Sequence, residues 1–155
     1  MNDTVPWLSE EEQRAWRAYV RLHQKLSARL VADLQTRSKL SGADFAVLVA
    51  LTDAAEGRLR FQELAEEIDW ERSRLSHQVG RMIKRDLVAR EECAEDGRGA
   101  FVVITPHGRE VIEAAAPEHV ATVRRLVVDA ISAEDFAALG RISAQLIEHL
   151  DNEPA

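Results

Sequence analysis

Hydrogen-bond donors are concentrated between residues 72 and 85 of this 155-residue sequence. In a helix of about 100° per residue, one side of this stretch is apolar and the opposite side is polar. No acidic residue interrupts the stretch, whereas an ordinary solvated helix face mixes in glutamate. Such donors are the ones that phosphates and base edges require. We therefore expect a DNA-binding helix that presents Ser73, Arg74, His77, Arg81 and Lys84, with Leu75, Val79, Met82 and Ile83 on its buried side.

The distribution of charge supports this expectation although the total does not. A formal net charge of −7 argues against a nucleic-acid partner, because phosphate binding requires clustered lysine and arginine. Between Trp70 and Arg90, however, there are six basic and two acidic residues, so this stretch carries +4 and the rest of the chain −11. A basic stripe on an acidic body favours docking on DNA through one face.

A second candidate group lies in the connector Ala94-Glu95-Asp96-Gly97-Arg98-Gly99. Its two glycines permit the positive φ angles of a hairpin tip. At such a tip Arg98 can enter a minor groove, and the Asp96 carboxylate can hold its guanidinium in a bidentate pair. Taken alone, these residues favour an ordinary exposed turn, since Asp-Gly is the commonest turn signal.

The elements that must position these groups follow from caps and periodicity. A start signal at Ser41 and the apolar residues after it predict a buried helix that Gly57 ends. An extended piece near residues 59–61 leads into a short helix over 61–68, a turn, and the donor-rich helix over about 72–86. Two strands are predicted over Leu87–Cys93 and Ala100–Thr105. Helix, short helix, turn, basic helix and hairpin are the layout of a winged helix-turn-helix.

Long helices are predicted at both ends of the chain. Ser9 begins a capping box that opens a helix of about 25 residues. Thr105 caps a fifth helix that continues to about Val127, with a kink at Pro117. Ser132 caps the last helix, whose apolar residues recur in steps of three and four, as in a helix-pairing seam. The seam consists of Phe136, Leu139, Ile142, Leu146 and Leu150.

The predicted order α-α-α-α-β-β-α-α describes a mainly α-helical fold with a small β-hairpin wing. Residues 1–155 fit a single domain. Within it we expect a DNA-binding lobe over residues 40–105 and a helical dimerisation lobe made of residues 9–36 and 106–150. A monomer could not bury end helices of this length, so we expect a homodimer.

Three segments resemble the MarR family of bacterial regulators, and the resemblance extends over about residues 11–150. The first joins Phe61–Ile68 to Arg72–Val79, and the second is Asp96-Gly97-Arg98-Gly99. The third is Val103-Ile104-Thr105-Pro106-His107-Gly108. The wing segment followed by Ile-Thr-x-x-Gly is the most specific, because many families share the helix-turn-helix.

The resemblance implies a homodimer on a pseudo-palindromic operator in double-stranded DNA. Recognition helices would lie in successive major grooves and wings in the flanking minor grooves. It implies a wing pair of Asp96 and Arg98, and one departure from the family is Gly80 on the outer side of the recognition helix. The major-groove or phosphate contacts that it implies are Ser73, Arg74, Ser76, His77 and Arg81.

Relatives of this kind commonly release DNA when a small aromatic or phenolic acid binds between the dimer helices and the winged lobe. In this sequence Arg17 can pair with a carboxylate and His23 can bond a hydroxyl, while Trp16 and Tyr19 can form aromatic walls. The same residues also fit a satisfied core histidine and a surface ion pair. The residues alone therefore leave open whether they form a ligand site or have ordinary structural roles. Only the resemblance to the family favours a repressor that is released by its ligand.

Cys93 ends the first predicted wing strand and offers a redox alternative, because oxidation there would move Arg98. A sensing thiol needs a lowered pKa. The neighbouring Glu91, Glu92 and Glu95 would raise it, so an inert thiol is favoured.

Other function classes have less support. No P-loop, dinucleotide fingerprint, nucleophile elbow or His-Glu-x-x-His motif occurs, so we expect neither an enzyme nor a cofactor. The histidines lack metal-ligand spacing and one cysteine cannot form a C-x-x-C cage, so no metal is expected. A longest apolar run of seven residues and the lack of an export leader favour the cytoplasm. A winged helix that binds protein instead of DNA would show an apolar or acidic outer face.

Overall fold

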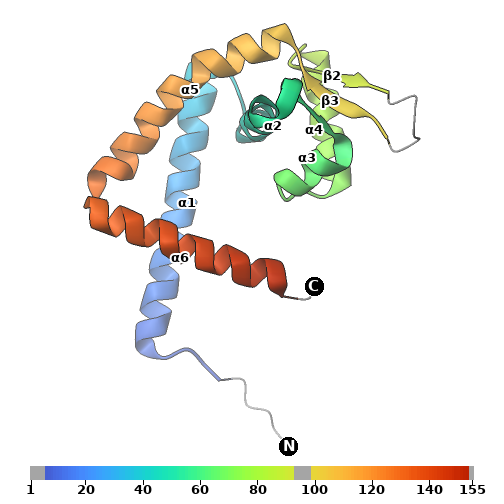
Figure 1. Ribbon diagram of the computed structural model, residues 1–155. Coiled ribbons are helices and arrows are strands. Elements are labelled where there is room, and N and C mark those ends of the chain that lie inside the picture. The colour runs from blue at the N-terminus through green and yellow to red at the C-terminus, as the bar shows by residue number, and fades with distance from the viewer. Residues whose placement is uncertain (1–5, 93–98, 154–155) are drawn as a thin grey trace, which may run out of the picture.

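The computed structural model describes residues 6–92 and 99–153, so Cys93, Asp96 and Arg98 lie outside the described residues. Within these ranges the chain forms six α-helices, three short strands and two 3₁₀ turns (Figure 1). The mainly helical fold with a small wing sheet is the predicted one. In chain order the elements are α1 (Glu10–Ser38), α2 (Gly42–Asp53), η1 (Ala55–Gly57), β1 (Arg58–Arg60), α3 (Phe61–Glu67), α4 (Arg72–Lys84), β2 (Val88–Glu91), β3 (Phe101–Ile104), α5 (Pro106–Leu126), η2 (Val128–Ala130) and α6 (Ala133–Asn152).

Side-chain caps fix where four of the helices begin. The Ser9 hydroxyl accepts a hydrogen bond from the Glu12 amide at 3.2 Å, and the Glu12 carboxylate accepts one from the Ser9 amide at 2.7 Å. Ser41 forms an equivalent capping box at the start of α2, and Thr105 and Ser132 cap α5 and α6. Each cap satisfies amides that a helix start leaves unpaired. The four predicted starts are confirmed.

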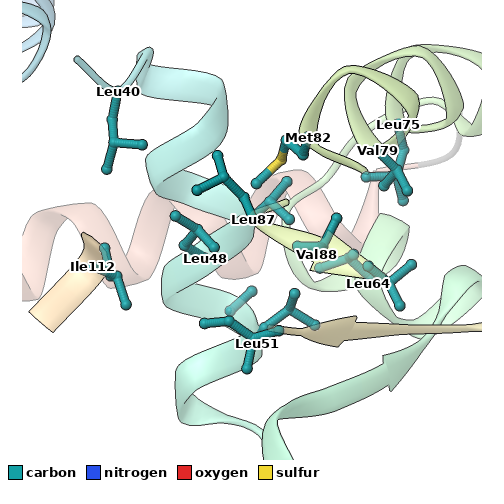
Figure 2. Close-up of a cluster of buried hydrophobic side chains, with 14 of the residues drawn as sticks. Leu40, Leu48, Leu51, Leu64, Leu75, Val79, Met82, Leu87, Val88 and Ile112 are labelled. Atoms are coloured by element: carbon teal, nitrogen blue, oxygen red, sulfur yellow. The ribbon is translucent and has the colours of Figure 1, made fainter. Parts of the chain in front are cut away.

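The winged lobe is built around α2, which runs through the middle of a single buried cluster (Figure 2). Leu48 and Leu51 of α2 are fully buried, and α4 contributes Leu75 and Met82, which are also fully buried. Burial of each large aliphatic side chain contributes about 1.5–3 kcal/mol. The inner side of α4 is therefore fixed by packing, which leaves its outer side free to carry polar groups.

The wing sheet has three strands, although only two were predicted. Its order is β1-β3-β2 and both pairs are antiparallel. The extended piece expected near residues 59–61 is β1, in which Leu59 lies opposite Val102 of β3. Phe61 belongs to α3 rather than to the extended piece. A three-residue strand has too little periodicity to reveal itself in the sequence, and its pairing with a distant strand defines it.

Three details of the helices differ from the predictions or qualify them. α2 ends at Asp53, and Gly57 instead closes the turn η1 with a φ of 68°. Ile83 is 41% exposed rather than buried, because it lies at the edge of the inner side of α4, one residue beyond Met82. α5 continues through Pro117 as one helix, and its ribbon curves along its length (Figure 1).

The junction between β3 and α5 depends on a glycine. A Cβ added to Gly108 would lie 2.0 Å from the carbonyl oxygen of Leu87, so the backbone would have to shift to admit it. The Thr105 hydroxyl meanwhile donates to the Asp86 carbonyl at 2.5 Å and accepts from the Gly108 amide at 2.9 Å. The Thr-Pro-His-Gly segment thus docks the start of α5 against the end of the helix-turn-helix.

The end helices are much less buried than the winged lobe. α1 packs on α5 near the lobe, while its N-terminal half projects away from it (Figure 1). Leu34 is the buried residue of α1, and α6 has none. No helix in the described ranges is both long and apolar enough to cross a membrane.

Candidate nucleic-acid interface

The outer side of α4 is a continuous exposed surface of donors, as the sequence predicted. Its members come from every turn of the helix, whereas the inner side is anchored in the core. The predicted separation of polar and apolar sides is confirmed, apart from Ile83. The exposed members are Ser73, Arg74, Ser76, His77, Arg81 and Lys84.

Trp70 holds Arg74 in place. The Arg74 guanidinium lies 4.0 Å from the centre of the Trp70 ring, and Trp70 is half-buried against the core. Such a cation–π contact contributes about 0.5–1 kcal/mol at an exposed site and limits the freedom of a long side chain. The guanidinium therefore enters any complex partly oriented, with its donors still available. Trp70 lies in the turn that the sequence predicts, but its contact with Arg74 was not predicted.

A buried polar pair joins α4 to α2. The Gln78 amide nitrogen donates to Asp44 Oδ1 at 2.7 Å, and both side chains are 2% exposed. The other half of the Gln78 amide accepts a hydrogen bond from Arg81 Nη2. The sequence does not predict this pair, because its local pattern indicates only that Asp44 belongs to a helix start.

Asp44 stays ionised despite its burial. Loss of solvent by itself raises the pKa of this carboxyl, but hydrogen bonds from Arg85 and Ser41 more than offset it and lower the pKa below its usual value. Arg85 Nη1 donates to Asp44 Oδ2 at 2.7 Å, and the Ser41 amide donates to the same oxygen at 2.9 Å. The C-terminal half of α4 is thereby attached to the start of α2 at both Gln78 and the C-cap residue Arg85.

A groove runs between the start of α4 and the base of the wing. The Arg90 guanidinium of β2 lies 5.7 Å from the Phe61 ring centre at one side of it. The groove joins the first two turns of α4 to β2 and to the residues just before β3, so α4 and the base of the wing face the same space, as in a winged helix that contacts one duplex with both elements. Its lining residues are Phe61, Gln62, Arg72, Ser73, Ser76, Arg90, Gly99 and Ala100.

The four residues predicted to bind a ligand lie along one exposed half of α1. Trp16 and Tyr19 stack with their ring centres 5.6 Å apart, and the Tyr19 and His23 rings are 6.4 Å apart. Arg17 donates to the Gln13 side chain at 3.3 Å. The two large aromatic side chains are more than half exposed. In the single chain this is an open surface rather than a pocket.

A more enclosed cavity of about 270 Å³ lies between α1 and α5. On one side Arg37 pairs with Glu118 at 2.9 Å, and on another the His119 ring lies 4.5 Å from Phe45. His119 Nδ1 is buried, and the described residues give it no hydrogen-bond partner. Nothing in the described ranges gathers three potential metal ligands. The cavity is lined by Asp33, Leu34, Arg37, Ser38, Val111, Ala114, Ala115, Glu118 and His119.

Comparison with known proteins connects this geometry to a family. A family model described as MarR family matches residues 38–99, which include the elements from α2 to β2. AbsC, a MarR family transcriptional regulator from Streptomyces coelicolor, is 39% identical with a TM-score of 0.91, covering 96% of this chain and 100% of its own. Sco3205, a MarR family transcriptional regulator from the same organism solved in complex with DNA, is 38% identical with a TM-score of 0.92, covering 97% and 94%.

A more distant structure, that of Staphylococcus aureus MarR in complex with salicylate and kanamycin, is 19% identical with a TM-score of 0.75 over 92% of this chain and 93% of its own. That likeness supports the fold alone. No curated protein matches the sequence. The identity and coverage of the two Streptomyces proteins, joined to the exposed donor side of α4 and the three-stranded wing, decide the assignment. The chain belongs to the MarR family of winged helix-turn-helix transcriptional regulators.

Proposed function

We propose that this regulator binds a pseudo-palindromic operator in double-stranded DNA as a homodimer and represses transcription there. The observation that carries the proposal is the outer side of α4, where six exposed donors stand without an acidic residue. Arginine and lysine pair with guanine and phosphate, and serine and histidine hydrogen-bond to base edges. The DNA complex of Sco3205, which shares 38% of its sequence with this chain, supports the same use of the lobe.

Support for the proposed dimer comes from α6, whose predicted seam is uncovered in the single chain. The exposed fractions of its five residues run from 39% at Phe136 to 68% at Leu150. Contiguous apolar surface of this kind marks an interaction site. A second copy would cover the seam and place two α4 helices on one duplex, which matches two-fold operators. In this arrangement Asp96 and Arg98 of each wing serve the flanking minor grooves.

Enrichment of bound fragments from a random duplex library tests the proposal and supplies the operator. Competition binding then compares the enriched duplex with a scrambled one. Arg74→Ala is expected to lower the affinity for the enriched duplex by about 10-fold more than the affinity for the scrambled one. The reason is that a bidentate base contact discriminates between bases by about 1–3 kcal/mol. Arg14→Ala, at an exposed position on α1, is the matched control. Equal losses on both duplexes would reduce Arg74 to a phosphate contact, and no enrichment at all would favour a protein partner.

We further propose that a small aromatic or phenolic acid releases this repressor from DNA. His119 Nδ1, for which the described residues provide no hydrogen-bond partner, and the Arg37 guanidinium border the α1–α5 cavity, so a phenolic or carboxylate oxygen would find a donor on each side. The salicylate complex of the Staphylococcus aureus relative supports this ligand class. A second candidate site for the ligand is the aromatic surface of α1, formed by Trp16, Arg17, Tyr19 and His23.

Calorimetric titration with a panel of aromatic acids, salicylate included, distinguishes between the two candidate ligand sites. His119→Ala is expected to abolish the binding heat if the cavity is the seat, whereas Arg17→Ala is expected to leave it unchanged. The opposite result would assign the ligand to the α1 surface. Absence of heat from every compound with the wild-type dimer would overturn ligand release as the mechanism.

A further inference from the structure

An open cleft of about 790 Å³ lies on the flank of α4 that faces α2. Half of its lining residues are cations, and its single carboxylate is that of Asp44, which is buried and already bonded to Arg85. The cleft therefore presents positive charge and free donors to solvent. It is lined by Gln35, Lys39, Ser41, Asp44, Gln78, Arg81, Lys84 and Arg85.

The buried amide of Gln78 directs one of these cations. A glutamine is seldom buried unless both halves of its amide are used. Here the nitrogen donates to Asp44 and the oxygen accepts from Arg81, so the orientation of the amide is set by a carboxylate on another helix. This holds the Arg81 guanidinium on the cleft side of α4. Arg74, by contrast, is held at the opposite end of the helix by Trp70.

We propose that the cleft binds a DNA-backbone phosphate. In this proposal Gln78, held by Asp44, is the positioning residue that orients the Arg81 guanidinium toward the phosphate. The inference rests on the DNA binding proposed above, and it assigns phosphate contacts and base contacts to different residues of α4. Arg81 and Lys84 contribute affinity that is independent of sequence, while Ser73, Arg74 and His77 read bases. Phosphate contacts fix the register of a protein on the duplex but carry no sequence information.

The dependence of binding on salt measures this directly, because each phosphate contact adds about 0.9 to the slope of log K against log salt. Fluorescence anisotropy from 50 to 200 mM salt compares the enriched duplex with the scrambled one. Arg81→Gln is expected to reduce the slope by about 1.8 for a dimer, which makes the fall in affinity over this range about 12-fold smaller. The loss at any one salt concentration is expected to be equal on the two duplexes.

Gln78→Met tests the positioning role, since methionine matches the shape of glutamine and makes neither hydrogen bond. We expect the same change of slope as for Arg81→Gln, at unchanged dimer mass. Thermal unfolding accompanies the measurement. If Gln78→Met unfolds, Arg81→Gln, at an exposed position, still tests the phosphate site. Arg14→Gln, which removes an exposed cation from α1, controls for net charge.

A larger loss on the enriched duplex than on the scrambled one would overturn the proposal, because Arg81 would then read a base. An unchanged slope of log K against log salt in Arg81→Gln would overturn the phosphate site in the cleft. A normal slope in folded Gln78→Met would overturn the positioning role. If the wild-type protein bound neither duplex in a salt-dependent way, the proposed function itself would fail, and the two failures are therefore distinguishable.

Discussion

The winged lobe and α6 place their apolar residues in opposite surroundings. In the lobe, side chains such as Leu48 and Met82 are fully buried around α2. In α6 no residue is buried, and Ile142 and Leu146 are about half exposed. Both regions contain amphipathic helices with capped or well-packed starts. The lobe therefore forms a core within one chain, whereas the apolar side of α6 is left uncovered in the single chain, which is the observation behind the proposed dimer.

The largest effect is expected from a charge placed in the seam of α6. Ile142→Glu would bury two carboxylates per dimer, at a cost of about 2 kcal/mol each, so the dimer dissociation constant should rise about a thousand-fold. Sedimentation equilibrium measures this, and Gln145→Glu on the same helix is the control. The fold of the winged lobe should persist in circular dichroism. An unaltered dimer would place the interface elsewhere.

A smaller loss is expected at the junction between the two regions. Gly108→Ala forces a methyl group against the Leu87 carbonyl, so the free energy of unfolding should fall by about 3 kcal/mol. Urea denaturation gives this value. Gly140→Ala in α6, where an added Cβ meets no atom within 4 Å, is the control and should not destabilise the chain. Equal stability of Gly108→Ala and wild type would mean that the start of α5 can shift freely.

Within the lobe, Asp44→Asn should lower the free energy of unfolding at pH 7 by about 2 kcal/mol, because hydrogen bonds to a charged group are lost. The folded-state pKa of Asp44 is lowered, so its stabilisation is present above the unfolded value of about 3.9 and is lost as the pH falls through the folded value. The gap between wild type and variant should therefore close below about pH 4 in urea titrations. A gap of constant size down to pH 2 would show that the charge of Asp44 contributes nothing.

The smallest effect is a gain. Gly80 lies on the outer side of α4, and an added Cβ there meets no atom within 4 Å. Gly80→Ala should raise the free energy of unfolding by about 1 kcal/mol, since alanine favours the helix. Thermal denaturation measures the gain, and competition binding checks whether DNA affinity is kept. Weaker binding by a more stable protein would show that the duplex approaches the helix backbone at this point.

Much of the fold could be predicted because its signals are local. The caps at Ser9, Ser41, Thr105 and Ser132 act within three or four residues, so the sequence alone locates those helix starts. The polar and apolar sides of α4 follow from helical spacing in the same way. The short strand β1 could not be predicted with comparable certainty, because its hydrogen bonds go to β3, more than 40 residues away in the sequence.

The family, the order of the helices and the donor side of α4 could be predicted from the sequence, because periodicity, caps and motifs are properties of neighbouring residues. The side chains that hold these donors in place are visible only in the tertiary structure. Trp70 lies under Arg74, and Asp44 of α2 fixes Gln78 and through it Arg81. Burial of a polar side chain depends on a partner from another element, and packing of the whole chain brings that partner within reach.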